Sequence, residues 1–377
     1  MSARVGGAYA IREGDAHGFF RAPFEAYGPD APYTSPMKGD LRRLLDPRRN
    51  PFYGGPGEGT LFSVYRGSIP VGRVSAHVHH EANRRFGLSR GYFGFLDVAE
   101  DATAARLLLD AAETWARRRG CTEIAGNFSL TAVQEIGVVT RGHERAPYTA
   151  MHWSPSHLAG ILEDAGYEPF FPMSTYELEL DRFDPDSLLG PRQREILASD
   201  GFAWTRLGRR SFRRRMGDVR RLLNTSFAMN PHFVPVGRAE FEFQAGPLTW
   251  VVDPRLSVLV DHEGCPAGVT VCIPDLNPFL RGTRSRLSWR TPLQYLKHRR
   301  NARRAVVVFS GVAPPLQSRG LAGVMLHRVT SALKEAGYTH LGITWVSTEN
   351  RPSLRYMEKL GARRLHDLSL FCKALDS

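Results

Sequence analysis

The residues from Val312 to Leu326 form a turn that could bind a pyrophosphate. The stretch VAPPLQSRGLAGVML follows a β-branched run, AVVVFSGV, which predicts a strand, and it opens an apolar-periodic segment that predicts a helix. A diphosphate placed at such a helix start meets unpaired backbone N–H groups and the positive end of the helix dipole. Gly320 lacks a Cβ and would let the backbone approach the ligand closely.

Side chains of this turn can add donors to the backbone amides. Gln317 and Arg319 carry N–H groups, and the small Ala322 leaves room beside them. A simple strand-to-helix turn without a ligand is the alternative interpretation. On the anion-binding interpretation, the residues nearest the ligand are Val312, Gln317, Ser318, Arg319, Gly320, Leu321 and Ala322.

The same turn resembles a known family motif. Val312, Pro314, Gln317, Gly320 and Ala322 fit the acyl-CoA motif V-x-P-x-x-[QR]-x-x-G-x-[GA] of the GCN5-related N-acetyltransferase (GNAT) superfamily. The downstream run NRPS, which begins at Asn350, resembles the second signature of that superfamily together with Tyr356 and Gly361. The resemblance implies that coenzyme A or an acyl-CoA binds as a substrate, with Asn350 among the binding residues.

An internal repeat indicates the elements that position this turn. Each half contains a predicted strand, a helix that ends at a glycine and a second strand, in the same order. In the first half these are GYFGFLDV, an amphipathic helix ending near Gly120, and CTEIAG; in the second they are AVVVFSGV, a helix ending at Gly337, and YTHLGITWV. Each half opens with a hairpin-like pair of strands, around Gly67 and Gly264. Gly120 to Gly166 spans 46 residues and Gly337 to Gly361 spans 24, so the first half carries about 22 extra residues, between Asn127 and Pro155.

The repeat and the resemblance together predict an α/β (α+β) protein of two tandem GNAT-like domains. Each domain would be a mixed twisted sheet flanked by helices. We expect an N-terminal domain over residues 1–185, on the acceptor side, and a C-terminal domain over residues 186–377 that binds the acyl-CoA. The corresponding turn of the first half contains Asp97, Glu100 and Asp101 and no glycine, and three carboxylates would repel a pyrophosphate. Its coenzyme site is therefore expected to be degenerate.

The positive charge of the chain is concentrated in two stretches. Lys and Arg number 50 against 38 Asp and Glu, a net charge of +12. Residues 281–304 contribute nine Lys or Arg and no acid, and residues 206–221 contribute eight Arg against Asp218. Such patches suit nucleic acid, an anionic membrane or an anionic substrate.

The first of these patches lies in an insert over residues 275–304 that mixes Trp and Leu with Arg. A basic amphipathic segment of this kind is typical of a membrane interface or of a site for an amphiphilic ligand, and a solvated basic loop is the alternative. A segment of this length usually has a function or is disordered. We expect it to line the acyl or acceptor tunnel and to contact anionic lipid.

Most of the chain, from about Arg21 onward, also resembles a bacterial family of tandem acetyltransferase-like proteins. The matching stretches include NPFYGG, GYFGFLDV, NPHFVPVGRAEF, IPDLN and ITWVSTEN. Members of that family include bacterial ceramide synthases, so the resemblance implies transfer of a fatty acyl group to the amine of a sphinganine-like base, giving a (dihydro)ceramide. Two positions depart from the family pattern: Asn127 follows Gly126 where proline is usual, and Thr348 stands where an acid is usual.

Acyl transfer to an amine needs a base, support for the oxyanion and an acid for the leaving thiolate. By resemblance to the superfamily, Tyr356 would serve the thiolate; a ring that only packs in the core is the alternative. Glu349 ends a strand beside the expected thioester and is the candidate base, or it only stabilises a helix start. The candidates for binding the acceptor are Glu135, Asp275, Asn277 and Trp289.

The other residues narrow the class of protein. The four cysteines lie far apart, which excludes a disulfide scaffold and a zinc site made of thiolates. His77, His79 and His80 indicate a polar sheet face, so no metal is expected. No window approaches the ~18 apolar residues of a membrane span. We expect a cytoplasmic protein, or one peripheral to the inner membrane.

An N-acyltransferase is the leading hypothesis, with no nucleic acid as partner. The alternatives are an N-acetyltransferase for a small-molecule or peptide amine, an aminoacyl-tRNA-dependent transferase, a nucleic-acid-binding regulator and a catalytically silent acyl-CoA sensor. Their predictions differ at the turn around Gly320. The tRNA-dependent transferase needs no working pyrophosphate turn, and DNA binding would depend strongly on salt and little on Gly320.

Overall fold

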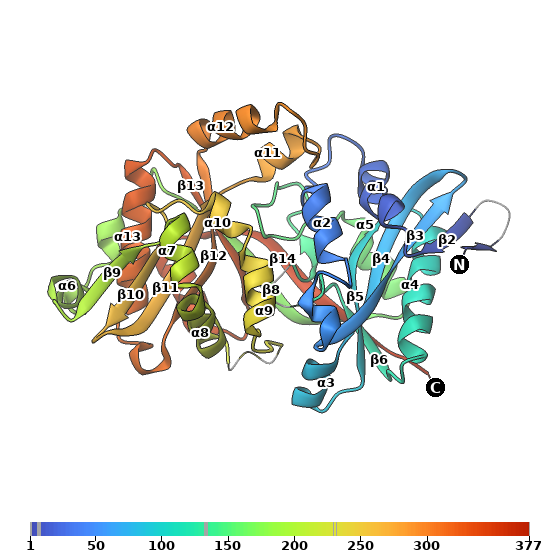
Figure 1. Ribbon diagram of the computed structural model, residues 1–377, viewed down its shortest axis with the longest axis horizontal. Helices are drawn as coiled ribbons and strands as arrows, with labels where there is room; N and C mark the ends of the chain where they lie inside the picture. The colour runs from blue at the N-terminus through green and yellow to red at the C-terminus, as the bar shows by residue number, and fades with distance from the viewer. Residues whose placement is uncertain (1, 6–8, 132–134, 229, 231, 377) are drawn as a thin grey trace.

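A single sheet runs through both halves of the protein (Figure 1). The structure, a computed structural model, describes residues 2–5, 9–131, 135–228, 230 and 232–376. Helices pack along this sheet in both halves of the molecule. The N- and C-termini lie at the same end of the molecule (Figure 1). No helix within the described ranges is both long and apolar enough to cross a bilayer.

The first half contains eight strands and five α-helices within the described residues. The strands are β1 (Ser2–Val5), β2 (Tyr9–Glu13), β3 (Gly57–Arg66), β4 (Ile69–His79), β5 (Arg90–Val98), β6 (Glu123–Gly126), β7 (Val138–Arg141) and β8 (Glu168–Glu179). The helices are α1 (Ala16–Tyr27), α2 (Lys38–Leu44), α3 (His80–Phe86), α4 (Ala102–Arg117) and α5 (His157–Asp164), with the 3₁₀ turn η1 (Pro51–Gly54).

The second half repeats this order with more helices before its hairpin. Its strands are β9 (Phe202–Arg206), β10 (Val258–His262), β11 (Cys265–Pro274), β12 (Arg304–Val312), β13 (His340–Ser347) and β14 (Arg363–Ala374). The helical segments are η2 (Pro185–Leu188), α6 (Pro191–Ala198), α7 (Arg209–Arg214), α8 (Met216–Ser226), α9 (Arg238–Ala245), α10 (Leu248–Val251), α11 (Asn277–Gly282), α12 (Thr291–Asn301), η3 (Pro314–Leu316), α13 (Leu321–Glu335) and α14 (Arg351–Leu360).

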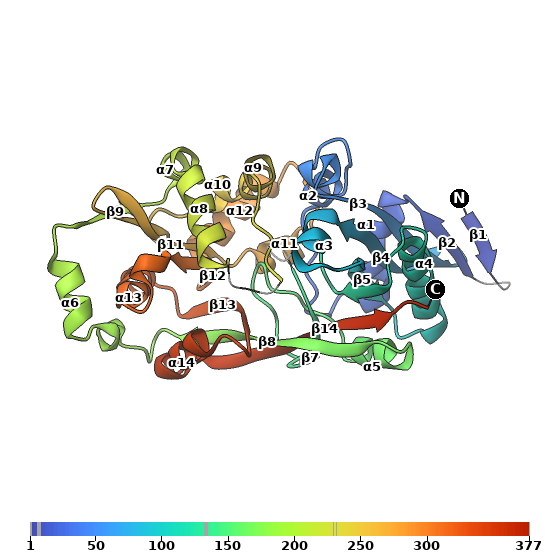
Figure 2. The ribbon, with the colours of Figure 1, turned by 90° about the horizontal axis from the view of Figure 1, so that it is seen from below.

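The strand order joins the halves by an exchange of their last strands. The order is β1-β2-β3-β4-β5-β6-β14-β8-β13-β12-β11-β10-β9. Thus β8, from the first half, pairs with β13, and β14, from the second half, pairs with β6. Figure 2 shows β8 and β14 running side by side beneath both halves. The sheet is mixed, because β5–β6 and β12–β13 are parallel and the other pairs are antiparallel.

The repeat predicted from the sequence is confirmed in the elements. The β3–β4 and β10–β11 hairpins turn at Gly67 and Gly264, whose φ angles of 62° and 78° are the left-handed values that glycine accepts at low cost. In each half a strand, a long helix and a parallel strand follow. A mixed α/β fold is therefore confirmed, and the boundary between residues 185 and 186 stays a prediction.

Each long helix covers its own part of the sheet. The buried face of α4 includes Leu108, Leu109 and Ala112, which pack in a core with β3, β4 and β5. Val324, Met325 and Val329 of α13 pack in a second core with residues of β10, β11 and β12. These apolar faces recur at helical spacing, and their burial sets which side of each helix faces the sheet.

The predicted insert contains the short helices α11 and α12. They lie at one edge of the molecule, above the second half in Figure 1. The insert is anchored at its base, because Asp275 and Asn277 are 1% and 5% exposed. Its far part is open to solvent: Leu287, Trp289, Leu293 and Leu296 are among the most exposed large apolar side chains of the described chain.

Candidate functional site

The turn between β12 and α13 presents free backbone amides. Gly320 is the N-cap of α13 with φ 96° and ψ −10°, and it provides no side-chain cap. Among the hydrogen bonds of the described residues, none uses the N–H of Gly320, Leu321 or Ala322 as a donor. These N–H groups lie at the positive end of a 15-residue helix, so this end of α13 can bind an anion.

The side chains of the turn divide between the core and the solvent. Leu321 is 1% exposed and Val312 9%, and both belong to the core under α13. Gln317 donates from Nε2 to the carbonyl oxygen of Val312 at 3.0 Å, so it closes the turn on the end of β12. Ser318, Arg319 and Ala322 are exposed and can reach a ligand from its outer side.

Helix α6 also lies against this turn, which the sequence analysis missed. A Cβ added to Gly320 would lie 3.0 Å from Nε2 of Gln193 and 3.5 Å from Cδ of Arg192. Both side chains come from the segment that links the two halves, outside the motif. The sequence gives no spacing signal for them, because their position depends on how α6 packs on α13.

The parallel strands β12 and β13 separate beside the turn. They pair from Arg304 with His340 as far as Val307 with Ile343. Beyond that point, β12 continues along β11 with an extra residue at Val308, and β13 continues along β8 with a second register shift. Bulges bend strands and increase their twist, so the two strand ends diverge. The hydroxyl of Thr344 donates to the carbonyl oxygen of Val308 at 3.4 Å, where the opening begins.

Tyr356 points toward the first turn of α13. Its hydroxyl would lie 3.3 Å from a Cβ added to Gly323. The oxygen is buried and has no hydrogen-bond partner among the described residues. Burial raises the pKa of the phenol well above its usual value, so the hydroxyl keeps its proton at neutral pH.

Two further predicted residues, Glu349 and Asn350, lie at the start of α14, the helix that carries Tyr356. Asn350 is the N-cap of α14 and accepts a hydrogen bond from the N–H of Ser353 at 3.2 Å. Glu349 is exposed on the turn before it, with its backbone N–H donating to Ser347 Oγ at 3.2 Å. The position of Glu349 is compatible with either a base or a helix-start acid, and its catalytic role stays a prediction.

Three of the four predicted acceptor residues converge on one segment of the first half, residues 146–153. Asp275 accepts hydrogen bonds from the N–H and the hydroxyl of Thr149 at 3.0 and 3.1 Å. Asn277 donates from Nδ2 to the carbonyl oxygen of Pro147 at 3.0 Å, and with Glu135 it lines a small polar hollow. Trp289 is 78% exposed on the insert, so the structure does not bring it to this hollow.

The polar hollow contains further titratable residues that the sequence analysis missed. His152 lies with Nδ1 3.8 Å from Glu135 Oε2 and Nε2 3.3 Å from Asn127 Nδ2. The buried Arg73 also lines the hollow, and it pairs with Asp97 at 2.7 Å. Residues Asn127, Glu135 and His152 all belong to the extra segment between Asn127 and Pro155, so its length was the available signal.

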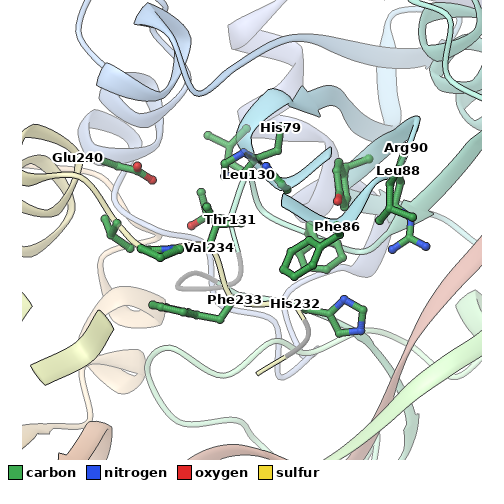
Figure 3. A pocket seen from close by; sticks show the side chains of 15 residues that line it. His79, Phe86, Leu88, Arg90, Leu130, Thr131, His232, Phe233, Val234 and Glu240 are labelled. Carbon is green, nitrogen blue, oxygen red and sulfur yellow. Dashed lines mark hydrogen bonds between the residues drawn. The ribbon is translucent and has the colours of Figure 1, made fainter. Parts of the chain in front are cut away.

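A larger and mostly apolar cavity of about 170 Å³ lies between the halves. Figure 3 shows Phe86, Leu88 and Leu130 of the first half facing Phe233 and Val234 of the second. No linear motif marks this cavity, because its walls are separated by more than 100 residues in the chain.

One wall of the cavity contains a buried acid. Glu240, on α9, is 7% exposed and accepts a hydrogen bond from Gln244 Nε2 at 3.1 Å. Burial, reinforced by the charge of Glu81, raises the pKa of this carboxyl to about 7.

Replacing this acid by glutamine should stabilise the protein at alkaline pH. The carboxyl ionises near pH 4.3 in an unfolded chain but only near 7 in the folded protein. The free energy of unfolding therefore falls as pH rises between these values, and the loss is complete above pH 7. Glu240→Gln should gain up to about 3 kcal/mol at pH 8 and little at pH 4.5, measured by urea unfolding. The exposed Glu242→Gln is the control, and equal gains at both pH values would contradict the prediction.

The turn of the first half that corresponds to the Gly320 turn is already capped by its own side chain. Asp101 is the N-cap of α4, and its Oδ1 accepts from the N–H of Ala104 at 3.0 Å. Its other oxygen accepts from the Tyr9 hydroxyl at 2.7 Å. A carboxylate therefore occupies the place where α13 leaves its amides free.

The histidines of β4 have aromatic neighbours. His77 stacks on Tyr92 with ring centroids 5.4 Å apart, and burial lowers its pKa to about 3. The described part of the chain contains no group of three or more His, Cys, Asp or Glu that could hold a metal ion.

Comparison with known proteins agrees with this geometry. Residues 218–362 match the profile of the Acetyltransferase (GNAT) family. The chain is 26% identical over 365 residues to the bacterial ceramide synthase of Caulobacter vibrioides, which covers 95% of this chain and 94% of that protein. It is 24% identical over 314 residues to protein YghO of Escherichia coli K12, covering 81% and 79%. Its fold is similar to that of a tandem GNAT protein from the clavulanic acid biosynthesis pathway, with a TM-score of 0.59, 13% identity and coverage of 98% and 99%.

The fold, the open turn and these matches define the class of the protein. Residues 218–362 match the GNAT family and the fold of the whole chain is similar to that of a tandem GNAT protein, so the resemblance read from the motifs is confirmed. More particularly, this match and the similarity to a bacterial ceramide synthase along nearly the whole chain support an N-acyltransferase. GNAT proteins take their acyl group from acetyl-CoA or another acyl-CoA, and the free amides at Gly320 fit the diphosphate of that donor.

Proposed function

We propose that this protein transfers a long acyl chain from acyl-CoA to the primary amine of a long-chain amino alcohol, with a sphinganine-like base as the acceptor and a (dihydro)ceramide as the product. The observation that carries the proposal is the uncapped start of α13 beside the separating strands β12 and β13. The similarity to bacterial ceramide synthase over 95% of the chain supports the choice of substrates.

In this proposal the diphosphate of the coenzyme lies at the start of α13. The N–H groups of Gly320, Leu321 and Ala322 donate to its oxygens, and the helix dipole adds to the attraction. Arg319 supplies positive charge from the turn itself, Arg192 supplies it from α6, and the neutral amide of Gln193 adds an N–H donor. In the first half, the cap by Asp101 excludes the same use of α4, so a single coenzyme site is proposed.

The thioester lies where β12 and β13 separate. The amine nitrogen attacks the carbonyl carbon, the carbon–sulfur bond breaks, and coenzyme A leaves as a thiolate. The nitrogen loses a proton to a base, and the thiolate takes one from an acid. We assign the acid to Tyr356, because its protonated hydroxyl is buried without a partner and faces the first turn of α13.

The acceptor head group is assigned to the polar hollow. Glu135 and Asn277 line it, and Asp275 shapes its wall through Thr149. Carboxylate and amide oxygens of this kind suit the ammonium and hydroxyl groups of an amino alcohol. Glu349, exposed at the end of β13, remains our proposed base, and Glu135 beside His152 is the competing candidate.

One assay tests the reaction. The purified protein is incubated with sphinganine and a mixture of acetyl-CoA and long-chain acyl-CoAs, and the products are analysed by mass spectrometry. We expect an amide with a long acyl chain and one free coenzyme A for each amide. Acetylation alone would favour a small-molecule N-acetyltransferase, and binding of acyl-CoA without any amide would contradict the proposal.

The insert is proposed to contact an anionic membrane. Trp289 and Leu287 are 78% and 77% exposed, among nine Lys or Arg and no acid in residues 281–304. Apolar side chains enter the interface and basic side chains attract anionic headgroups, at about 1 kcal/mol for each charge. Both proposed substrates with long chains would be drawn from such a surface.

Trp289→Glu should weaken binding to vesicles with 30% phosphatidylglycerol by at least tenfold in a sedimentation assay, because it removes an inserted ring and adds a repelled charge. Ile69→Glu, at a side chain 49% exposed on the β3–β4 hairpin, makes the same change of charge in the first half and should have little effect. Equal losses for both variants would show that the insert does not dock.

A further inference from the structure

We infer that the apolar cavity between the two halves binds the alkyl chain of the acyl donor. The inference rests on the proposed function and adds to it the place where the chain lies. The cavity is lined by α3, β5 and residues 128–131 of the first half and by residues 232–236 and α9 of the second (Figure 3). The second half, which carries the coenzyme turn, therefore provides only one of its walls.

A series of packed aromatic rings leads from β12 to the wall of the cavity. Phe309 follows the extra residue of β12, at the point where this strand leaves β13. Its ring centroid lies 5.7 Å from that of Phe227, which in turn lies 5.7 Å from that of Phe233. Phe233 is a wall of the cavity.

A second series of aromatic rings leads from β13. Trp345 lies in the register shift of β13, and its ring centroid is 6.2 Å from that of Phe171. Phe171 contacts the ring of His232 at 4.4 Å, and His232 lines the cavity. Both strands of the opening are therefore linked to this cavity through intervening aromatic rings, so an acyl chain that starts at the thioester meets apolar surface in this direction.

The walls carry little net charge at neutral pH. Burial lowers the pKa of His79 and His232 to about 4, so both rings are neutral. Arg90 pairs with Glu123 at 2.8 Å, and Glu240 is half protonated near pH 7. An uncharged alkyl chain gains free energy when it leaves water for such a cavity, whereas an ammonium group would lose its favourable hydration there.

A short segment separates this cavity from the polar hollow. Phe128, Leu130 and Thr131 line the apolar cavity, and Ser129 lines the hollow. All four are buried, with at most 7% exposure. One stretch of chain therefore presents apolar side chains to one space and a hydroxyl to the other, which separates the acyl chain from the polar head of the acceptor.

The test is the affinity of non-hydrolysable S-alkyl-CoA thioethers of increasing chain length, measured by calorimetry. Each methylene that enters the cavity should strengthen binding about threefold to fourfold, until the cavity is full and the affinity reaches a plateau. Leu88→Trp fills part of the cavity from the first half and should move the plateau to shorter chains, with unchanged affinity for coenzyme A itself. Val234→Trp, on the opposite wall, should do the same.

The control is Leu107→Trp, a half-buried leucine of α4 outside the cavity, which should keep the wild-type plateau. The inference would be overturned if the affinity did not depend on the length of the S-alkyl chain, or if neither cavity variant moved the plateau. Binding of coenzyme A itself would still support the coenzyme site in that case. The same variants are also assayed with amines of increasing chain length. If they change only the dependence on the chain length of the amine, the cavity binds the acceptor, and the inference is also overturned. Absence of any coenzyme A binding by the wild type would overturn the proposed function and the inference together.

Discussion

Gly320→Asp should abolish binding of coenzyme A, with a loss of affinity of more than 100-fold by calorimetry, and no amide should form. The substitution places a carboxylate at the N-cap of α13, as Asp101 does at the N-cap of α4. The new side chain would accept hydrogen bonds from the free amides and repel the diphosphate. It would also lie close to Gln193, since a Cβ at this position is 3.0 Å from its Nε2.

A matched variant separates this effect from backbone strain. Gly361 ends α14 with φ 63°, has no atom within 4 Å of an added Cβ, and would bear the same charge in a similar left-handed conformation. Gly361→Asp should lower stability slightly and leave coenzyme A binding within about twofold. If the Gly320 and Gly361 variants bound coenzyme A equally well, the turn would not be the binding site.

Tyr356→Phe should lower kcat about 100-fold, a usual size for loss of a general acid, while the affinity for coenzyme A changes little. The phenylalanine keeps the ring in the core between α13 and α14, and only the hydroxyl is lost. Because that hydroxyl has no hydrogen-bond partner in the described residues, its removal leaves no buried group unsatisfied. The fall in kcat would therefore report the chemical step.

Tyr338→Phe is the control for this variant. Tyr338 is 4% exposed in the same core, and burial likewise raises its pKa, to about 12. It follows the far end of α13 and should be neutral for turnover. Steady-state rates with one acyl-CoA and one amine compare the two, and equal rates would limit Tyr356 to a packing role.

The sequence was most informative where function and secondary structure use the same local pattern. The motif around Gly320 combines a strand end, a turn that needs a left-handed residue and a helix start, and each of these leaves a signal within 15 residues. The internal repeat predicted the second strand–helix–strand unit and the hairpins for the same reason. Apolar spacing fixed the buried faces of α4 and α13.

The exchange of β8 and β14 between the halves could not be read from the sequence. Each of these strands follows the short helix that comes last in its half, but nothing local states which neighbour each one pairs with. The pairing of β14 with β6 joins residues more than 240 positions apart, as in Phe371 with Gly126. Register of this kind depends on the faces that become buried when the halves pack together.

The site was predictable only in part for the same reason. Glu135 and Asn277 were singled out from separate segments, and the structure shows that they line one hollow. His152 and Gln193 come into place through tertiary packing and carried no motif. Trp289 was grouped with the acceptor residues because of its sequence neighbours, yet it lies in solvent on the turn before α12. An amphipathic composition does not tell a tunnel wall from an exposed surface.

The most direct measurement is a crystal structure with a non-hydrolysable long-chain acyl-CoA bound. The account predicts diphosphate oxygens within hydrogen-bond distance of the amides of residues 320–322, and the sulfur between β12 and β13 beyond Val307. A diphosphate bound at α4, on the basic insert or elsewhere, with the start of α13 left free, would contradict it.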